Sequence, residues 1–288
     1  MVHRDRHKTK LKSYIERMSS MYMKIPPIES MENAFSVKGK NVVVTGGNRG
    51  IGLGIATAFA QSGANVVILC RNYESGSKVA EEFAKYGGKY ACYACDISDF
   101  AMVKTAVAKV FEFFDNVDVL VNNAGVASTT PFLNDENLSE WHRIINTNLH
   151  GVAHVVHTVA PKMVEAKRGG CIINISSIGG QRVGNAKNHP NPPYNVSKAG
   201  LDIFSKYLAA VLGDDGIRVH VISPGLTHSD LDKDLPPETF EMAETRLPTH
   251  RFGEPIEIGA LCVFLASPAA VQMHGNVIQH DGGALGTA

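Results

Sequence analysis

Short apolar runs alternate with longer amphipathic segments along the chain from residue 38 onward. Most of these runs are unbroken Val, Ile and Leu, which is typical of parallel strands that are buried on both faces of a sheet. An antiparallel sandwich would instead show alternating apolar and polar residues. We therefore expect seven strands, at residues 41–45, 65–70, 90–95, 117–121, 171–175, 217–222 and 276–279.

The segments between these runs have the spacing of apolar residues that predicts helices. Asp99 and Asp135 provide N-cap side chains, and Gly63 and Gly213 stand where helices would end. Strands that alternate with helices predict an α/β fold: a single doubly wound domain with a mostly parallel seven-stranded sheet, over residues 35–288. We expect helices near residues 50–62, 74–86, 99–114, 138–167, 195–213 and 255–266.

Composition and charge limit the classes of partner that the protein is expected to bind. The chain has 28 Lys and Arg residues against 28 Asp and Glu residues, so it carries no net field that would attract nucleic acid or an anionic membrane. No apolar stretch approaches the roughly 20 residues that span a bilayer, and the N-terminus lacks the apolar segment of a secretory signal. We expect a cytoplasmic protein with a small-molecule partner.

Residues 1–34 form a basic arm outside the predicted domain, which we expect to be poorly ordered. A targeting or nucleic-acid role is the alternative interpretation of its charge.

Cysteine and histidine spacing does not indicate a metal site. The five cysteines lie in apolar runs, as reduced buried thiols of cytosolic proteins do. Cys92 and Cys95 form a C-x-x-C, but within a strand their side chains would point to opposite faces, about 10 Å apart along it. His150, His154 and His157 share a helical face without a further ligand type, so we expect no metal.

A glycine-rich segment joins the first predicted strand to the first long helix. It runs Thr45-Gly46-Gly47-Asn48-Arg49-Gly50-Ile51-Gly52. Glycines allow a tight turn there and let the backbone approach a pyrophosphate, whose charge the N–H groups of the helix N-terminus stabilise. The segment predicts a dinucleotide site.

Further short motifs stand near the ends of later strands and in later helices. In chain order they are Asp96, Asn122-Asn123-Ala124-Gly125, Asn148, Ser177, Tyr194, Lys198, Pro224-Gly225 and Asp281-Gly282-Gly283.

With the glycine segment, this succession of motifs resembles the short-chain dehydrogenase/reductase family over about residues 35–283. The resemblance implies a Rossmann fold and an enzyme that acts on CH–OH groups, such as a carbonyl reductase. It also implies a homo-oligomer, tetramer or dimer, formed through the helices that contain Asn148 and Lys198. Thr227 and Ser229 depart from the family, which usually has a hydrophobic residue and a threonine there. The implied cofactor contacts are Gly46, Asn48, Arg49, Gly50, Ile51, Gly52, Arg71, Asn72, Asp96, Ile97, Asn123, Ala124, Gly125, Tyr194, Lys198, Pro224, Gly225, Thr227 and Ser229.

The residues at the end of the second predicted strand indicate which of the two nicotinamide cofactors, NAD(H) or NADP(H), the site would bind. An NAD site of this type usually has an acidic residue about 20 residues beyond the glycine loop, where it binds the ribose 2′-hydroxyl. Here Cys70 stands at that position and Arg71 follows it. Arg71 and Arg49 can donate charge-assisted hydrogen bonds to a 2′-phosphate, so we predict NADP(H). Two solvated surface arginines are the alternative.

Tyr194 and Lys198 are one helical turn apart and share a helical face. A nearby ammonium favours the phenolate of a tyrosine, so the pair predicts a proton shuttle. By resemblance, Ser177 orients the substrate oxygen, Tyr194 exchanges its proton, Lys198 tunes Tyr194 and holds the nicotinamide ribose, and Asn148 supports a water. Ser176 competes for the serine role, although the family pattern favours Ser177.

The substrate is not evident from the sequence. A proline-rich insertion at 185–193 forms either a pocket wall or a surface bulge, and residues 226–252 resemble a mobile lid. We expect a secondary alcohol or ketone: a sugar, polyol or sugar acid, a hydroxysteroid or another small ketone. A 3-oxoacyl thioester reductase and a non-catalytic NADP-binding regulator are the alternatives.

Overall fold

The computed structural model of the protein describes residues 28, 30–128, 130–183, 191–229 and 237–286. Most of the predicted N-terminal arm, and residues 184–190 of the predicted insertion, lie outside these residues. One part of the arm is helical: the short helix α2 spans Met31–Ala34, and the Ser30 hydroxyl caps it by accepting from the Asn33 N–H at 3.1 Å.

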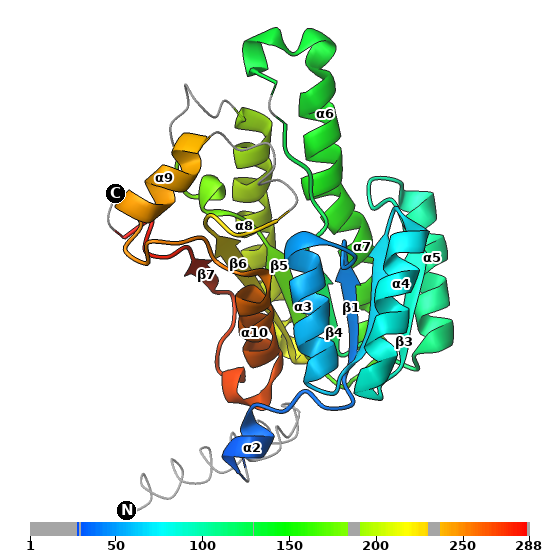
Figure 1. Cartoon of the computed structure of the whole chain (residues 1–288). Helices are drawn as coiled ribbons and strands as arrows, with labels where there is room; N and C mark the ends of the chain where they lie inside the picture. The colour runs from blue at the N-terminus through cyan, green and yellow to red at the C-terminus, as the bar shows by residue number, and fades with distance from the viewer. Residues whose placement is uncertain (1–27, 29, 129, 184–190, 230–236, 287–288) are drawn as a thin grey trace, which may run out of the picture.

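Seven strands form one sheet in the order β3-β2-β1-β4-β5-β6-β7, and every neighbouring pair is parallel (Figure 1). The expected α/β fold is confirmed. The strands are β1 (Asn41–Thr45), β2 (Asn65–Cys70), β3 (Tyr90–Ala94), β4 (Val119–Asn122), β5 (Gly170–Ile175), β6 (Ile217–Pro224) and β7 (Val277–His280).

Helices cover both faces of the sheet (Figure 1). Helices α3, α4 and α10 bury their apolar residues against one face, and α5, α7 and α8 against the other. Their bounds are α3 (Gly50–Gln61), α4 (Tyr73–Phe83), α5 (Phe100–Phe113), α7 (Gly151–Ala166), α8 (Pro192–Leu212) and α10 (Pro255–Ala266).

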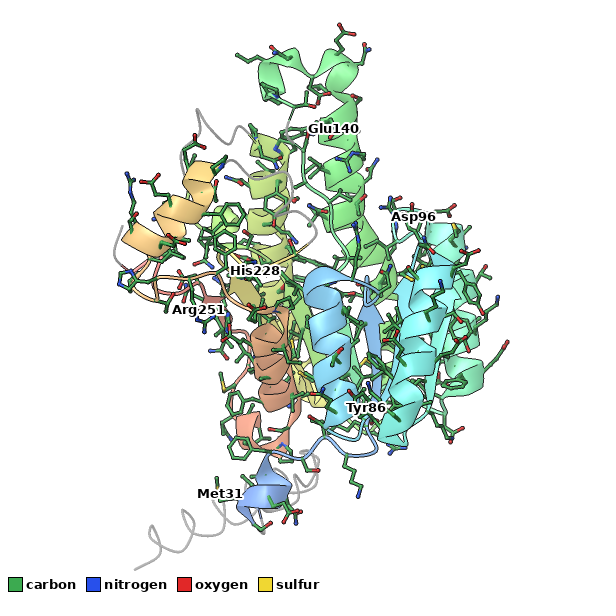
Figure 2. All side chains as sticks on the ribbon, viewed as in Figure 1. Met31, Tyr86, Asp96, Glu140, His228 and Arg251 are labelled. Atoms are coloured by element: carbon green, nitrogen blue, oxygen red, sulfur yellow. The ribbon has the colours of Figure 1, made fainter. Side chains whose placement is uncertain are left out.

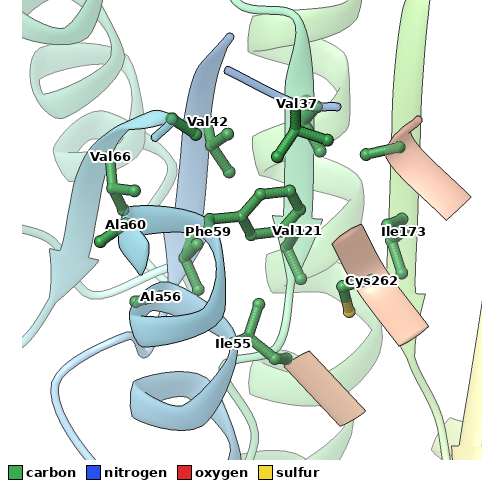
Figure 3. Close-up of a cluster of buried hydrophobic side chains, with 14 of the residues drawn as sticks. Val37, Val42, Ile55, Ala56, Phe59, Ala60, Val66, Val121, Ile173 and Cys262 are labelled. Carbon is green, nitrogen blue, oxygen red and sulfur yellow. The ribbon is translucent and has the colours of Figure 1, made fainter. Parts of the chain in front are cut away.

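Successive residues of a central strand enter different cores. Val42 and Val44 pack under α3, where Phe59 and Ile55 lie among the strand valines (Figure 3), whereas Val43 packs in the opposite core. Each of these side chains has no exposed surface. This arrangement explains the unbroken apolar runs, because both sides of the pleat are buried.

Two regions differ from the expected helices. The stretch expected as one helix from 138 to 167 consists of α6 (Ser139–Ile145), a π-helical turn (Asn146–His150) and α7. Within the predicted lid, helix α9 (Pro237–Arg246) was not expected.

The two glycines expected at helix ends have different conformations. Gly63 ends α3 in the left-handed region with φ 78°, as predicted. After α8, Gly213 stays right-handed with φ −61°, and Gly216 makes the left-handed turn with φ 69°.

The strand order places a topological switch at β1, whose neighbours β2 and β4 come from crossovers in opposite directions. In open α/β sheets, ligands bind beyond the carboxyl ends of the strands at such a point. Asp96 lies at this edge of the molecule and Tyr86 lies at the opposite one (Figure 2). No helix among the described residues is long and apolar enough to cross a membrane.

Candidate active site

The glycine segment turns sharply between β1 and α3. Gly50 has a φ of 50°, in the left-handed region that favours glycine. A Cβ at Gly52 would overlap the carbonyl oxygen of Gly46. The loop is therefore as tight as the sequence predicts, and it leads directly into the N-terminus of α3, where the first N–H groups of a helix are available to an anion.

A cleft of about 660 Å³ opens beside this loop, at the carboxyl ends of the central strands. This volume is in the range of small-ligand sites. The cleft brings together most of the residues that the sequence assigned to the cofactor. Those that line it are Gly46, Asn48, Arg49, Gly50, Ile51, Gly52, Arg71, Asn72, Asp96, Ile97, Asn123, Ala124, Gly125, Tyr194, Lys198 and Ser229.

The segment after β4 is fixed to the end of β1. The Thr45 hydroxyl accepts hydrogen bonds from the backbone N–H groups of Asn123, at 3.0 Å, and Ala124, at 3.1 Å. In return the Asn123 side chain donates to the Thr45 carbonyl at 3.0 Å. These bonds hold the wall of the cleft against the glycine loop.

The end of β2 forms the next part of the wall. Asn72 caps α4 by accepting from the Ser75 N–H at 3.0 Å, and Asn48 of the glycine loop donates to the Ser75 hydroxyl at 2.8 Å. Arg49 and Arg71 are exposed at this end of the cleft. Among the described residues that line the cleft, Asp96 is the one carboxylate.

Tyr194 and Lys198 project from α8 at the other end of the cleft. The Lys198 ammonium lies 5.6 Å from the centre of the Tyr194 ring and donates to the Ile175 carbonyl at 2.8 Å. Lys198 is 4% exposed. Ser177 follows β5 and forms a hydrogen bond with Tyr194. The structure therefore brings the three predicted side chains together.

Burial dominates the proton equilibria of this group. It lowers the pKa of Lys198 to about 8, against the opposing charge of Asp202. Burial also raises the pKa of Tyr194, and the hydrogen bond with Ser177 only partly offsets this effect. Lys198, whose ammonium donates to the Ile175 carbonyl, is not among the groups that shift this pKa, so its tuning of Tyr194 stays a prediction.

Asn148 lies in the π-helical turn and is fully buried. Its side-chain oxygen accepts from the Val126 N–H at 2.8 Å, and its amide donates to the Val126 carbonyl at 2.9 Å. Asn148 thus holds the cleft wall just beyond Gly125. π-turns of this kind are frequent at functional sites.

Comparison with known proteins decides the family. A family model described as Enoyl-(Acyl carrier protein) reductase matches residues 46–284. A solved short-chain type dehydrogenase/reductase from Mycobacterium marinum is similar in fold, with a TM-score of 0.83 and 32% identity, covering 88% of this chain and 99% of that one. The chain belongs to the short-chain dehydrogenase/reductase family.

Relatives in the family carry different substrate names. A 3-oxoacyl-[acyl-carrier-protein] reductase, FabG, from Chlamydia trachomatis is 37% identical over 245 residues, which cover 85% of this chain and 96% of the relative. A gluconate 5-dehydrogenase from Burkholderia cenocepacia, solved in complex with NADP and tartrate, has a TM-score of 0.83 and 29% identity, over 90% of this chain and all of that one (100%).

Five residues expected from the family pattern are not part of the cleft lining. Asn148 and Ser177 contact residues that line it. Pro224 ends β6, and Gly225 follows it. Thr227 is 7% exposed, and its hydroxyl donates to the Gly225 carbonyl at 3.3 Å. None of these five is among the described lining residues.

The two neighbouring serines after β5 have different roles in the structure. The Ser176 hydroxyl donates to the Lys198 carbonyl at 3.2 Å, and Ser176 also acts to lower the pKa of Asp202, which burial raises. Ser177 reaches Tyr194 instead. This geometry favours Ser177 for the family's serine role.

The structure adds lining residues that the sequence did not assign. Asn72 and Ser75 form an Asn-x-x-Ser capping pattern, the one local signal that was available for Ser75. The others depend on strand ends and loops that meet only in the fold. The added residues are Leu69, Cys70, Ser75, Cys95, Val126, Ala127, Thr147, Ile175 and Ser176.

Within the described chain, no three His, Cys, Asp or Glu side chains are grouped to hold a metal ion. The His150 ring bonds the Asn146 side chain at 3.1 Å, and His154 bonds the Ile97 carbonyl at 3.0 Å. Cys92 and Cys95 lie in opposite cores, as their strand spacing predicts.

Proposed function

We propose that the protein is an NADP(H)-dependent oxidoreductase that interconverts a secondary alcohol and a carbonyl, with Tyr194 as acid and base. The observation that carries this proposal is the meeting of Ser177, Tyr194 and Lys198 at one end of the cleft that the glycine loop lines. A protein that only binds a nucleotide does not need this group.

The residues of the cleft fit a dinucleotide. The N-terminus of α3 offers backbone N–H groups to a pyrophosphate, and Gly52 lacks the side chain that would fill the turn. Arg49 and Arg71 would bind a 2′-phosphate, and no described carboxylate lining the cleft comes from β2 to repel it. The gluconate 5-dehydrogenase solved with NADP supports the same choice.

The chemistry divides between cofactor and protein. A bound nicotinamide supplies or accepts the hydride. Tyr194 gives its phenolic proton to the carbonyl oxygen during reduction, and Ser177 orients that oxygen by a hydrogen bond. Because burial raises the pKa of Tyr194, the phenol is protonated at neutral pH and ready to donate. The Lys198 ammonium then stabilises the phenolate that remains.

The proposed substrates follow the relatives and the cleft. Among the relatives, the name of one gives a 3-oxoacyl thioester and the name of another a sugar acid. We also propose polyols, hydroxysteroids and other small ketones as substrate classes.

We also propose that the protein forms a homo-oligomer. Its five free, buried cysteines suit a reducing, cytoplasmic compartment.

The test follows the oxidation of NADPH, and of NADH in parallel, with an acetoacetyl thioester, a keto sugar acid, a ketose and a ketosteroid. We expect turnover with at least one class and a preference for NADPH. A preference for NADH would refute the cofactor assignment. NADPH binding without turnover of any class would favour a regulatory protein.

Tyr194→Phe removes the proton donor and keeps the ring. We expect kcat to fall by about 10²–10⁴-fold with little change in the affinity for NADPH. Tyr86→Phe, at the opposite edge of the molecule (Figure 2), is the matched control and should retain turnover. Undiminished turnover by Tyr194→Phe would exclude Tyr194 as the acid.

A further inference from the structure

Two cysteine thiols face each other at the wall of the cofactor cleft. Cys70 ends β2 and lines the cleft, and Cys92 lies in the neighbouring strand β3. Their Sγ atoms are 3.6 Å apart. Both residues are buried, at 4% and 7% exposure, so the cleft is the route by which a small molecule reaches them.

Helix α4 closes over this thiol pair at Gly76. A Cβ at residue 76 would collide with the sulfur of Cys92 and lie 2.6 Å from that of Cys70. Only a glycine therefore lets the first turns of α4 approach both sulfurs. The positive end of the helix dipole lies at this point and favours a thiolate.

The contacts distinguish the two sulfurs. A hydrogen bond from Cys92 lowers the pKa of Cys70, burial opposes it, and the Gly76 backbone adds to the lowering. The same pairing, together with burial, raises the pKa of Cys92. Cys70 is thus the thiol of the pair that ionises more readily, and Cys92 is the one that holds its proton more tightly.

We propose that Cys70 is a site of oxidation by peroxide and that Cys92 resolves it into a disulfide that closes the 2′-phosphate end of the cleft. The Cys70 thiolate attacks one oxygen of hydrogen peroxide, the O–O bond breaks, and hydroxide leaves to give the sulfenic acid. The Cys92 sulfur then attacks the Cys70 sulfur, and the hydroxyl leaves as water with the Cys92 proton. The proton that Cys70 had released neutralises the hydroxide, so two thiols and one peroxide give one disulfide and two waters.

The bond moves the wall of the cleft. A disulfide requires about 2.05 Å between the sulfurs, so the pair must close from 3.6 Å. In the sheet register Cys70 lies opposite Ala94, and Cys92 lies opposite Ile68, so the bridge joins diagonal neighbours. The end of β2 must therefore shift toward β3.

Arg71 and Asn72 follow this strand end directly. The Cys70 thiol donates to the Asn72 carbonyl at 3.1 Å, and the bridge removes that bond. The Asn72 side chain also caps α4 through Ser75, so the displacement reaches the start of the helix. We expect this displacement to weaken cofactor binding. That expectation rests on the proposed NADP(H) site, whereas the formation of the disulfide does not.

The test exposes the reduced full-length protein to hydrogen peroxide, blocks the remaining thiols with N-ethylmaleimide and maps the peptides by mass spectrometry. We expect a bridge between Cys70 and Cys92 before any other thiol reacts. Cys95 is the internal control: it lines the same cleft, but burial and the nearby Asp96 and Asp99 raise its pKa to about 12. Oxidation of Cys95 ahead of Cys70, or no bridge, would overturn the proposal.

Two variants separate the steps. In Cys92→Ser the sulfenic acid of Cys70 should persist and be trapped by dimedone, whereas Cys95→Ser should form the bridge as the wild type does. Prior addition of NADP⁺ should slow the bridge by covering Cys70. A Cys92→Ser protein that forms no dimedone adduct at Cys70 would contradict the assignment of the nucleophile.

NADPH binding, measured by fluorescence, tests whether the disulfide closes the cleft to the cofactor. We expect the bridged protein to bind NADPH at least about tenfold more weakly, with recovery after dithiothreitol. A bridge that leaves the affinity unchanged would overturn the closing of the cleft. If the reduced protein does not bind NADPH, the proposed function fails while the mapped bridge still stands.

Discussion

The ammonium of Lys198 lies inside the protein with one carboxylate close behind it. Asp202 is one helical turn further along α8 and is 7% exposed, with one side-chain oxygen that has no hydrogen-bond partner among the described residues. Its charge raises the pKa of Lys198 against burial. The Ser176 hydroxyl and Lys206 are the other groups that act on this carboxylate. Asp202 is thus a positioning residue that keeps Lys198 charged.

Asp202→Asn should therefore move the alkaline limb of activity to lower pH. We expect the proposed activity to decline as pH rises through the pKa of Lys198, which is about 8, and removal of the carboxylate should lower that pKa further. At pH 8 we expect kcat/KM to fall by about three- to tenfold, with less change at pH 6. The pH profile of kcat/KM measures this shift. An unchanged limb with uniformly lower activity would mean that Asp202 only supports packing.

Arg71 carries the cofactor prediction at the level of one side chain. Arg71→Ala removes a charge-assisted hydrogen bond to the 2′-phosphate, which is worth about 1.5–3 kcal/mol. We expect the KM for NADPH to rise by about 10- to 100-fold while that for NADH changes little. Arg168→Ala, at the opposite end of the sheet beside Asn116, is the matched control. Equal losses for both cofactors would show that Arg71 acts in another way.

At the scale of elements, the sequence predicted what depends on local pattern. Every strand began or ended within two residues of its expected bounds, because unbroken apolar runs mark strands buried on both faces. The π-helical turn at 146–150 was missed, since one inserted residue leaves the apolar spacing nearly helical. Helix α9 was missed because Pro236-Pro237 and scattered charges favour a loop.

Helix α8 leaves an apolar stripe uncovered. Val196, Ile203, Tyr207 and Val211 are 48–66% exposed and recur every one or two turns on one side of the helix. A contiguous apolar face of this kind suits a second copy of the chain. The proposed homo-oligomer would bury it.

Ile203→Glu places a charge in the middle of this stripe. We expect the oligomer to dissociate, because an unpaired carboxylate in an apolar interface costs several kcal/mol. Light scattering coupled to size exclusion measures the mass. Met102→Glu, on the exposed side of α5, should leave the mass unchanged. A monomeric wild type would refute the proposed assembly.

At the scale of the whole molecule, two cores on either side of one sheet hold the cleft in place. The site residues come from five strand ends and three helices, so their meeting depends on the sheet order. Sequence motifs named most of the lining because most of these motifs mark strand ends, and the pair Tyr194 and Lys198 marks one helix. The roles proposed for Cys70 and Asp202 could not be predicted from the sequence, because they depend on neighbours in space. Cys70 lies beside Cys92 of the next strand, and Asp202 acts on the buried Lys198.

Phe59 tests the core beneath the glycine loop. It projects from α3 into the buried cluster (Figure 3) and has no exposed surface, and Phe59→Ala leaves a cavity that close-packed strands cannot fill. We expect the free energy of unfolding in urea to fall by about 3–5 kcal/mol. Phe100→Ala, 37% exposed on α5, should cost much less. A similar loss for both would mean that the core relaxes around the cavity.

The central place of β1 also shapes how the chain is made. Among the described strands β1 is the first to leave the ribosome, yet its two sheet neighbours are β2, at 65–70, and β4, at 119–122. One edge of β1 can pair early, when β2 and then β3 emerge. The other edge stays open until residue 122 has been synthesised, with its backbone groups available to another chain. During the synthesis of α5, a nascent chain of this protein thus has an edge of β1 that is open to pairing with another chain, and the cleft does not yet exist.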